Sequence, residues 1–340
     1  MGWTGISLMD LDRGSRGRLA WADIAKAISI VLLVIYTTTI DSYYVNELLI
    51  LARMPLFFFV SGLFAWRIIV SADLLTFLRD RVGNLVYLYA IWTWILYLTT
   101  KGAASLFFGA PFYPKSNLWI FTDPPLTTWF LYALAIAFVV ARLVRNLPIW
   151  LVMAVACAIY AVAVWTGDWR HQDFVERLLR LFPFFWLGLA IRPLVGEVVE
   201  TWHRWWPAVC AAFLALAWGV LDTPLSAFAP VTFATTLVGI FGLLLLARNL
   251  SDRSWSRPIA IVGASTLYIY VLQRIQLYYL NQVREALGLV DPAWGLLEAV
   301  IIVIVGVLFG RWAAAQPGLG WLFQAPWVGG GARAGIPSRA

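Results

Sequence analysis

Asp23 and Lys26 lie three positions apart in an otherwise apolar stretch near the N-terminus. At this spacing two residues share one face of a helix, so the carboxylate can pair with the ammonium group. Thr37 follows Lys26 by eleven positions, and eleven steps of about 100° return to within about 20° of the starting face. The two side chains would stand about 16 Å apart along the helix axis. The spacing predicts a polar stripe that could line a substrate pocket.

Three further polar residues lie within apolar stretches later in the chain. Arg53 directly precedes the aromatic run at 54–62, and Gln273 and Arg274 end the run at 266–274. Arg274 also lies within the longer apolar run at 258–280, far from either end of it, and an arginine at such a depth is expected to face a bundle interior or a wet cavity. We therefore predict that Gln273 and Arg274 line a functional cavity.

Most of these positions also have a structural explanation. Asp23 and Lys26 could form an ion pair at the membrane interface, with the lysine extended towards water. The hydroxyl of Thr37 could be satisfied by the backbone carbonyl of the preceding helical turn. Arg53 could reach lipid headgroups. The sequence leaves these alternatives open.

The composition requires a membrane around this chain. Of the 340 residues, 62% are hydrophobic and 13% are charged, against about 25% charged residues in an ordinary globular domain. A soluble fold of this size cannot bury so much apolar surface. High apolar content excludes disorder, and two cysteines, Cys157 and Cys210, exclude a disulfide scaffold. The net charge of +7 comes from dispersed basic residues, which argues against nucleic-acid binding.

Ten apolar runs are long enough to predict an all-α fold, a polytopic transmembrane helix bundle of about ten helices. The first run has about 22 residues, more than the 7–15 of a signal-peptide core, so we expect an uncleaved helix. The sixth run is short and begins among Arg177 and Arg180. The predicted spans are Leu19–Ile40, Leu48–Trp66, Val82–Thr99, Thr128–Val144, Pro148–Trp165, Leu178–Ile191, Pro207–Leu221, Val231–Ala247, Pro258–Leu280 and Trp294–Trp312.

Basic residues alternate between the two sets of connections and so predict the orientation. Most arginines lie before the first span or after an even-numbered span. The opposite set holds little beyond Lys101, Lys115, Arg170 and Arg284. Arginine-rich connections stay in the cytoplasm, so both termini are predicted to be cytoplasmic. The two histidines, His171 and His203, then lie on opposite sides, and no metal site is expected.

Five segments together resemble the acyltransferase 3 family of integral membrane enzymes, in particular its branch similar to fucose 4-O-acetylases. Trp21–Ile28 is similar to the branch's opening Asp-Ile-Ala-Lys-Gly motif, and Arg53–Gly62 to its Met-Pro-Leu-Phe-Phe-Phe-x-Ser-Gly signature. Trp129–Tyr132 is similar to its Trp-Phe-Leu motif, and Phe184–Gly188 and Ile261–Tyr270 to later segments. The resemblance covers most of the chain and implies O-acylation of carbohydrates.

The chain departs from the family where the chemistry is expected. The family has a basic residue followed, after ten others, by a histidine; Lys26 takes the basic position and Thr37 the histidine position. A second family histidine falls on Gln273. Neither Thr nor Gln can act as a general base near neutral pH, and loss of a base typically costs about 10²–10⁴-fold in rate. The resemblance implies that the catalytic positions are Lys26, Thr37 and Gln273. It implies that the substrate-binding positions are Asp23, Arg53, Trp129 and Arg274.

Two functions of different class follow. The resemblance implies an O-acyltransferase in a bacterial inner membrane. The enzyme would take an acyl group from acyl-CoA on the cytoplasmic side, beside Lys26. The expected acyl group is acetyl, so the expected donor is acetyl-CoA. The acceptor would be a hydroxyl of a cell-envelope carbohydrate or a lipid-linked sugar, with no metal involved. The missing histidines leave open a non-catalytic relative that binds or moves a glycan or a lipid.

The expected domain organisation is simple. A cytoplasmic segment at 1–18 precedes the transmembrane domain at 19–312. The longest connection, at about 100–127, is expected outside. Residues 313–340 are rich in Gly, Pro and Ala, which predicts a loose cytoplasmic tail.

Reporter fusions test the predicted orientation. A fusion at Lys115 is expected to report the outer side, and a fusion at Arg253 the cytoplasmic side, because arginine-rich connections are retained there. Two reporters with opposite compartment requirements at each site control for expression. If both sites report the same side, the orientation is wrong.

Overall fold

The computed structural model describes residues 20–39, 43–102, 105, 119–122, 124–125, 128–166, 173–221, 223–289 and 293–328. The predicted segment at 1–18 and most of the predicted outer connection at 100–127 lie outside the described residues. Within the described ranges the chain forms helices and no strand. The all-α prediction is confirmed.

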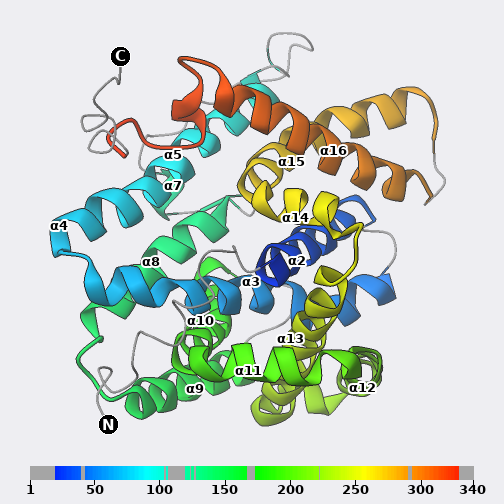
Figure 1. Cartoon of the computed structure of the whole chain (residues 1–340). Helices are drawn as coiled ribbons and strands as arrows, with labels where there is room; N and C mark the ends of the chain where they lie inside the picture. Colours follow the sequence, from blue (N-terminus) through cyan, green and yellow to red (C-terminus); the bar gives the residue numbers. More distant parts are fainter. Residues whose placement is uncertain are drawn as a thin grey trace.

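The helices pack together as a bundle (Figure 1). Their bounds are α2 (Ala20–Thr38), α3 (Tyr43–Ser71), α4 (Leu74–Thr76), α5 (Asn84–Tyr97), α7 (Trp119–Thr122), α8 (Trp129–Leu143), α9 (Ile149–Thr166), α10 (Phe174–Ala190), α11 (Arg192–Trp202), α12 (Trp206–Val220), α13 (Ala229–Ser251), α14 (Ser256–Ala264), α15 (Thr266–Ala286) and α16 (Ala293–Ala315). Short π or 3-10 segments are η1 (Phe77–Gly83), η2 (Leu98–Gly102), η3 (His203–Trp205), η4 (Pro224–Ala227) and η5 (Gly320–Leu322).

The prediction of a membrane bundle of about ten helices is roughly consistent with the structure, although length and composition alone identify six to eight candidate spans among the described residues. Six described helical stretches are long and apolar enough to cross a membrane: Ala20–Thr38, Leu49–Trp66, Leu74–Gly102, Ile149–Thr166, Ala229–Ser251 and Trp294–Ala315. Two bent pairs bring the number to eight if each pair is one span. These pairs are α10 with Arg192–Val220, bent by 82°, and α14 with α15, bent by 74°. The chain is therefore a polytopic membrane protein.

The bend between α14 and α15 interrupts the predicted straight span at Pro258–Leu280. The break falls at Ser265, directly after the end of α14. Gly263 lies against the backbone of α2, since a Cβ built on this glycine would lie only 1.7 Å from the carbonyl oxygen of Asp23. This contact holds α14 along α2, so the chain turns at Ser265 before α15 begins.

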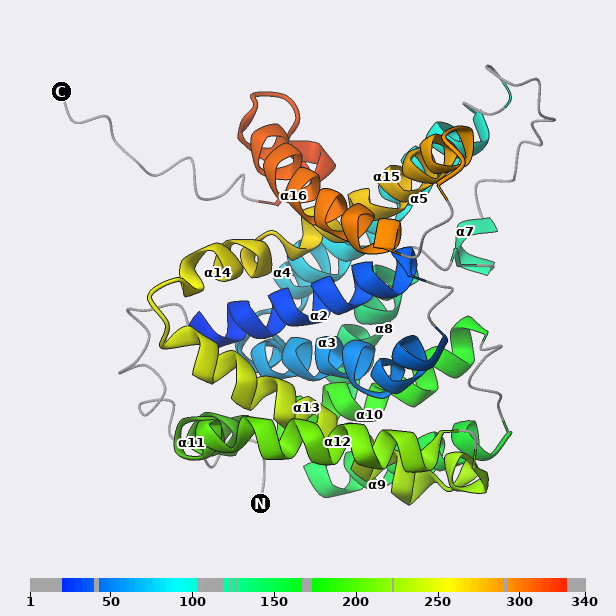
Figure 2. The same ribbon diagram turned by 90° about the vertical axis from the view of Figure 1, so that its right-hand side faces the viewer.

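Helices α3 and α10 cross with their backbones in contact. A Cβ on Gly62 would lie 2.0 Å from the carbonyl oxygen of Phe185, and a Cβ on Gly188 would lie 2.1 Å from that of Phe59. Small residues permit such close packing between membrane helices. In Figures 1 and 2, α2 and α3 run side by side through the middle of the bundle, between α14–α16 and the α9–α12 region.

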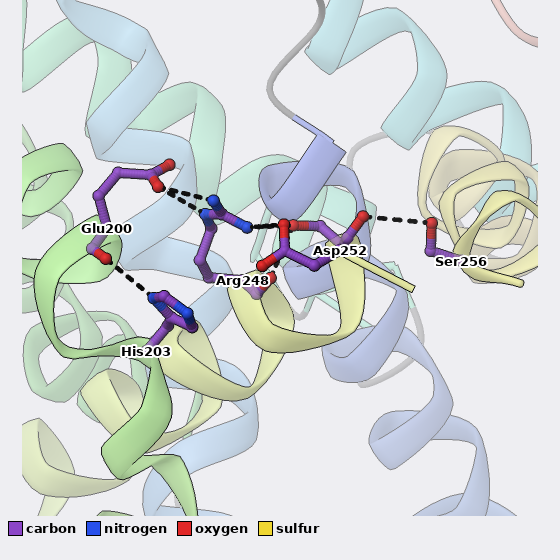
Figure 3. A network of polar contacts seen from close by, with 6 residues as sticks. Glu200, His203, Arg248, Asp252 and Ser256 are labelled. Atoms are coloured by element: carbon purple, nitrogen blue, oxygen red, sulfur yellow. Dashed lines mark hydrogen bonds and ion pairs between the residues drawn. The ribbon is translucent and has the colours of Figure 1, made fainter. Parts of the chain in front are cut away.

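The arginine at the end of α13 links that helix to α11. Arg248 donates to the carboxylate of Glu200 with a nitrogen–oxygen distance of 2.7 Å, and it also pairs with Asp252 (Figure 3). His203 Nδ1 lies 2.8 Å from the carbonyl oxygen of Glu200. This histidine belongs to a structural network between two helices.

The C-terminal part departs from the predicted loose tail. Residues 316–328 fold back onto α5: Trp92 donates from Nε1 to the carbonyl oxygen of Leu322 at 2.5 Å, and Ala325 donates from its backbone N–H to Asn84 Oδ1 at 2.8 Å. The ring of Trp327 lies edge-on to Tyr87. Packed aromatic rings and backbone hydrogen bonds anchor this part of the tail.

Replacement of Gly188 by alanine tests the crossing of α3 and α10. The added methyl group would lie only 2.1 Å from the Phe59 carbonyl oxygen, a severe steric overlap, so the helices must separate. Overpacking typically costs about 1–3 kcal/mol, and we expect the Tm of the purified chain to fall by about 2–6 °C. Gly219→Ala on α12 is the control, because a Cβ there meets nothing within 4 Å. Equal Tm changes in both variants would contradict the crossing.

Candidate functional site

A cavity of about 350 Å³ lies among α2, α3, α8, α9, α10, α13 and α15. We call it the arginine cavity, because four arginines from three helices line it. None of its described lining residues is a histidine or a carboxylate. Its polar and aromatic lining consists of Tyr36, Thr37, Arg53, Trp129, Tyr160, Arg177, Arg180, Phe184, Thr236, Tyr270, Gln273 and Arg274.

A second cavity, of about 360 Å³, adjoins the first. We call it the lysine cavity after Lys26, which lines it together with Arg81 and mainly apolar residues. Three residues line both cavities: Leu33, Met54 and Tyr270. The two cavities therefore meet at these side chains.

The cavities follow one another along the helix axes. On α2, Lys26 lines the lysine cavity, and positions 36–37 line the arginine cavity. On α3 the order is reversed, with positions 50–55 lining the arginine cavity and 54–64 the lysine cavity. Helix α15 repeats the order of α2, and α8 repeats that of α3. The order of the lining residues on all four helices therefore shows that the cavities lie in tandem across the bundle.

Thr37 and Gln273 line the same cavity, and Lys26 lines the adjoining one. The Thr37 hydroxyl donates to the carbonyl oxygen of Val34 at 2.8 Å, which is the backbone contact foreseen as its structural explanation. Its oxygen can still accept a hydrogen bond. Gln273 is only 6% exposed, and no described residue is hydrogen-bonded to its Oε1. The structure brings these positions together; their catalytic roles stay predictions.

The charged pair on α2 forms as its spacing predicts. Lys26 Nζ lies 3.1 Å from Asp23 Oδ1 and 5.4 Å from the centre of the Phe64 ring. Asp23 is buried and lines neither cavity. The structure therefore places Asp23 behind Lys26, where it can position the ammonium group, rather than against a ligand.

Arg53 is a buried residue of the arginine cavity. It is 4% exposed, and its guanidinium carbon lies 3.4 Å from the centre of the Tyr36 ring. Such stacking suits a guanidinium held on an aromatic face. Trp129 is also buried, with its ring stacked on Phe58 and 5.9 Å from the Arg177 guanidinium carbon. Arg53 and Trp129, two of the four residues predicted to bind substrate, both line the cavity.

Arg274 lines the cavity from an exposed position. The sequence predicted a buried arginine deep in one straight span. Because the chain bends at Ser265, Arg274 belongs to the separate helix α15. No hydrogen bond or ion pair joins its guanidinium to the residues that the structure describes. Arg274 therefore lines a cavity as expected, but from a helix that follows a bend rather than from one straight span.

Arg177, Arg180 and Tyr270 were not predicted as site residues. Arg180 is 3% exposed, pairs with Glu176 at 2.6 Å, and donates to the carbonyl oxygen of Ala163 on α9. The available signal was the three-residue spacing of the arginines, which puts both on one helix face. In the sequence the two arginines mark only the beginning of the short sixth predicted span.

Tyr270 is the one polar side chain among the three residues shared by the cavities. The Phe130 N–H, in the first turn of α8, lacks an intrahelical acceptor and donates to the Tyr270 hydroxyl at 3.2 Å. The hydroxyl proton is then directed elsewhere, and Tyr270 can donate to a ligand at the junction of the cavities.

Comparison with known proteins identifies the family. A family model described as an acyltransferase domain matches residues 19–315, so the chain belongs to the acyltransferase 3 family. Among curated proteins it is similar to the inner membrane protein YcfT of Escherichia coli strain K12, with 24% identity over 291 residues. The alignment covers 75% of this chain and 78% of YcfT. No solved structure matches the chain. The resemblance to the acyltransferase 3 family, drawn from the five sequence segments, is confirmed.

Proposed function

We propose that the chain is a membrane O-acyltransferase whose two cavities hold its two substrates. Acyl-CoA, with acetyl-CoA expected, places its acyl end in the lysine cavity, and the acceptor hydroxyl of a carbohydrate or lipid-linked sugar lies in the arginine cavity. The observation that carries the proposal is the tandem order of the cavities, which meet at Leu33, Met54 and Tyr270. A carbonyl carbon and a hydroxyl could meet there.

The charge distribution supports a sided arrangement. Arginine-rich connections favour a cytoplasmic N-terminus, and Lys26 lies nearer the start of α2 than Thr37. The lysine cavity would then face the cytoplasm, where acyl-CoA is found, and the arginine cavity would face outwards. The name of YcfT supports the inner membrane as the location.

The proposed step balances without a bound cofactor. The acceptor hydroxyl oxygen attacks the thioester carbonyl carbon, the new C–O bond forms, and the C–S bond breaks. The products are the ester and CoA, and the proton of the acceptor hydroxyl is transferred to the CoA sulfur. Tyr270 would donate its hydroxyl proton in a hydrogen bond to the carbonyl oxygen as charge develops, and such a donor is typically worth about 10²–10³-fold in rate.

A second function remains a candidate because of one specific observation. The described residues that line the two cavities include no histidine and no carboxylate. General acid–base catalysis typically supplies about 10²–10⁴-fold, so its loss favours a non-catalytic protein that binds or moves a glycan or lipid through the same cavities.

Transfer of labelled acetyl from acetyl-CoA to envelope glycans or lipid-linked sugars, using the purified chain, distinguishes the two functions. The enzyme predicts transfer by the parent chain, with Tyr270→Phe lowering the rate by about 10²-fold because it removes the carbonyl donor. Thr37→Val should also lower the rate, because it removes a hydroxyl at nearly constant volume. Arg253→Gln, at an exposed position, is the control and should leave transfer unchanged.

The double variant Thr37→His with Gln273→His restores the family's residue type at both positions. An imidazole with a pKa near 6.5 acts as a base only when deprotonated, so any gain in transfer should rise as the pH increases from about 5.5 to 7.5. Absence of transfer in the parent and in the double variant would contradict the proposed enzyme.

A further inference from the structure

We propose that the ligand of the arginine cavity carries a phosphate group, either as a sugar phosphate or as the phosphate that joins a sugar to a lipid. The identification of this ligand with the acceptor substrate rests on the proposed function. Its binding does not depend on acyl transfer and can be measured separately.

Two guanidinium groups of the cavity are available to a ligand. Arg177, on α10, lies against the face of Trp129, and Arg274, on α15, is exposed towards the cavity side of its helix. Neither forms an ion pair with a described residue. Arg53 and Arg180 add positive charge to the same lining, and Arg180 is already paired with Glu176. The described lining therefore favours an anion.

The number and origin of these arginines favour phosphate over carboxylate. A guanidinium donates two parallel hydrogen bonds to either group. One such fork already occupies both oxygens of a carboxylate, whereas the tetrahedral oxygens of a phosphate can accept from forks that approach from different helices. Arg177 and Arg274 come from different helices and line one cavity, which suits a phosphate.

A buried acceptor on the same wall indicates that the ligand also has hydroxyl groups. Gln273 is 6% exposed, and no described residue donates to its Oε1. A buried acceptor without a donor is costly, and a sugar hydroxyl can supply that donor. The Thr37 oxygen lines the same cavity. The cavity of about 350 Å³ is at the small end of the range of roughly 300–1,000 Å³ for ligand pockets, so it suits a small sugar phosphate.

Equilibrium binding to the full chain tests this inference. The chain is purified in a polyoxyethylene ether detergent, which contains neither sugar nor phosphate. Glucose 1-phosphate is compared with glucose and with inorganic phosphate, and farnesyl phosphate is compared with farnesol. We expect each phosphate-bearing probe to bind at least about 10-fold more tightly than its neutral counterpart, because each charge-assisted contact is worth about that much.

Substitutions separate the phosphate contact from the hydroxyl contact. Arg177→Gln and Arg274→Gln should each weaken glucose 1-phosphate binding by about 10- to 100-fold. Arg177→Lys, which keeps the charge but loses the fork, should weaken it less. Gln273→Met should weaken binding of glucose 1-phosphate and leave inorganic phosphate unchanged. Arg253→Gln is the matched control, and the Tm of each variant reports folding. Because Arg274 is exposed, we expect its replacement to leave the Tm unchanged.

Each outcome decides a separate point. The inference would be overturned if glucose 1-phosphate bound no more tightly than glucose and farnesyl phosphate no more tightly than farnesol. It would also be overturned if both arginine-to-glutamine variants kept full affinity. Binding of farnesyl phosphate without glucose 1-phosphate would support it and assign the phosphate to a lipid. Phosphate binding without acetyl transfer would keep the inference and reject the proposed enzyme. Acetyl transfer without phosphate binding would keep the proposed enzyme and reject the inference.

Discussion

The backbone contact between α3 and α10 is the constraint on which the arginine cavity depends. Gly62 and Gly188 let the two helices approach until a Cβ on either would strike the partner's carbonyl oxygen. Membrane helices gain little from the hydrophobic effect between them, so close packing of this kind determines which helices meet. The crossing brings Arg53 on α3 into one cavity with Arg177 on α10. A larger side chain at either glycine would move two of the cavity's walls.

A charged group between membrane helices must be paired or kept wet, because lipid tails do not solvate it. The structure uses both solutions. Lys26 is paired with Asp23, and Arg180 with Glu176. Arg274 instead lines the cavity without such a partner among the described residues. Under the proposed function, the arginine cavity and the mainly apolar lysine cavity are joined at Leu33, Met54 and Tyr270. An acyl group would then pass between the substrates while neither substrate crosses the membrane.

Local features of the sequence were enough for the helical class, the family and the polar stripe of α2, because apolar length, motif order and helical spacing need no tertiary contact. The bend at Ser265 could not be predicted, since it follows from Gly263 packing on the distant backbone of Asp23. Arg180 was missed as a site residue because its carbonyl partner, Ala163, lies on another helix. The packing of Trp327 on Tyr87 likewise joins residues far apart in the chain.

The most direct test of the two-cavity arrangement is the side from which each cavity is reached. In a chain with Cys157→Ser and Cys210→Ser, single cysteines are introduced as Thr37→Cys in the arginine cavity and Ser61→Cys in the lysine cavity. A membrane-impermeant maleimide is then applied to intact cells and to inverted vesicles. The tandem order predicts labelling of Thr37→Cys from outside only and of Ser61→Cys from the cytoplasmic side only. Labelling of both positions from the same side would contradict it.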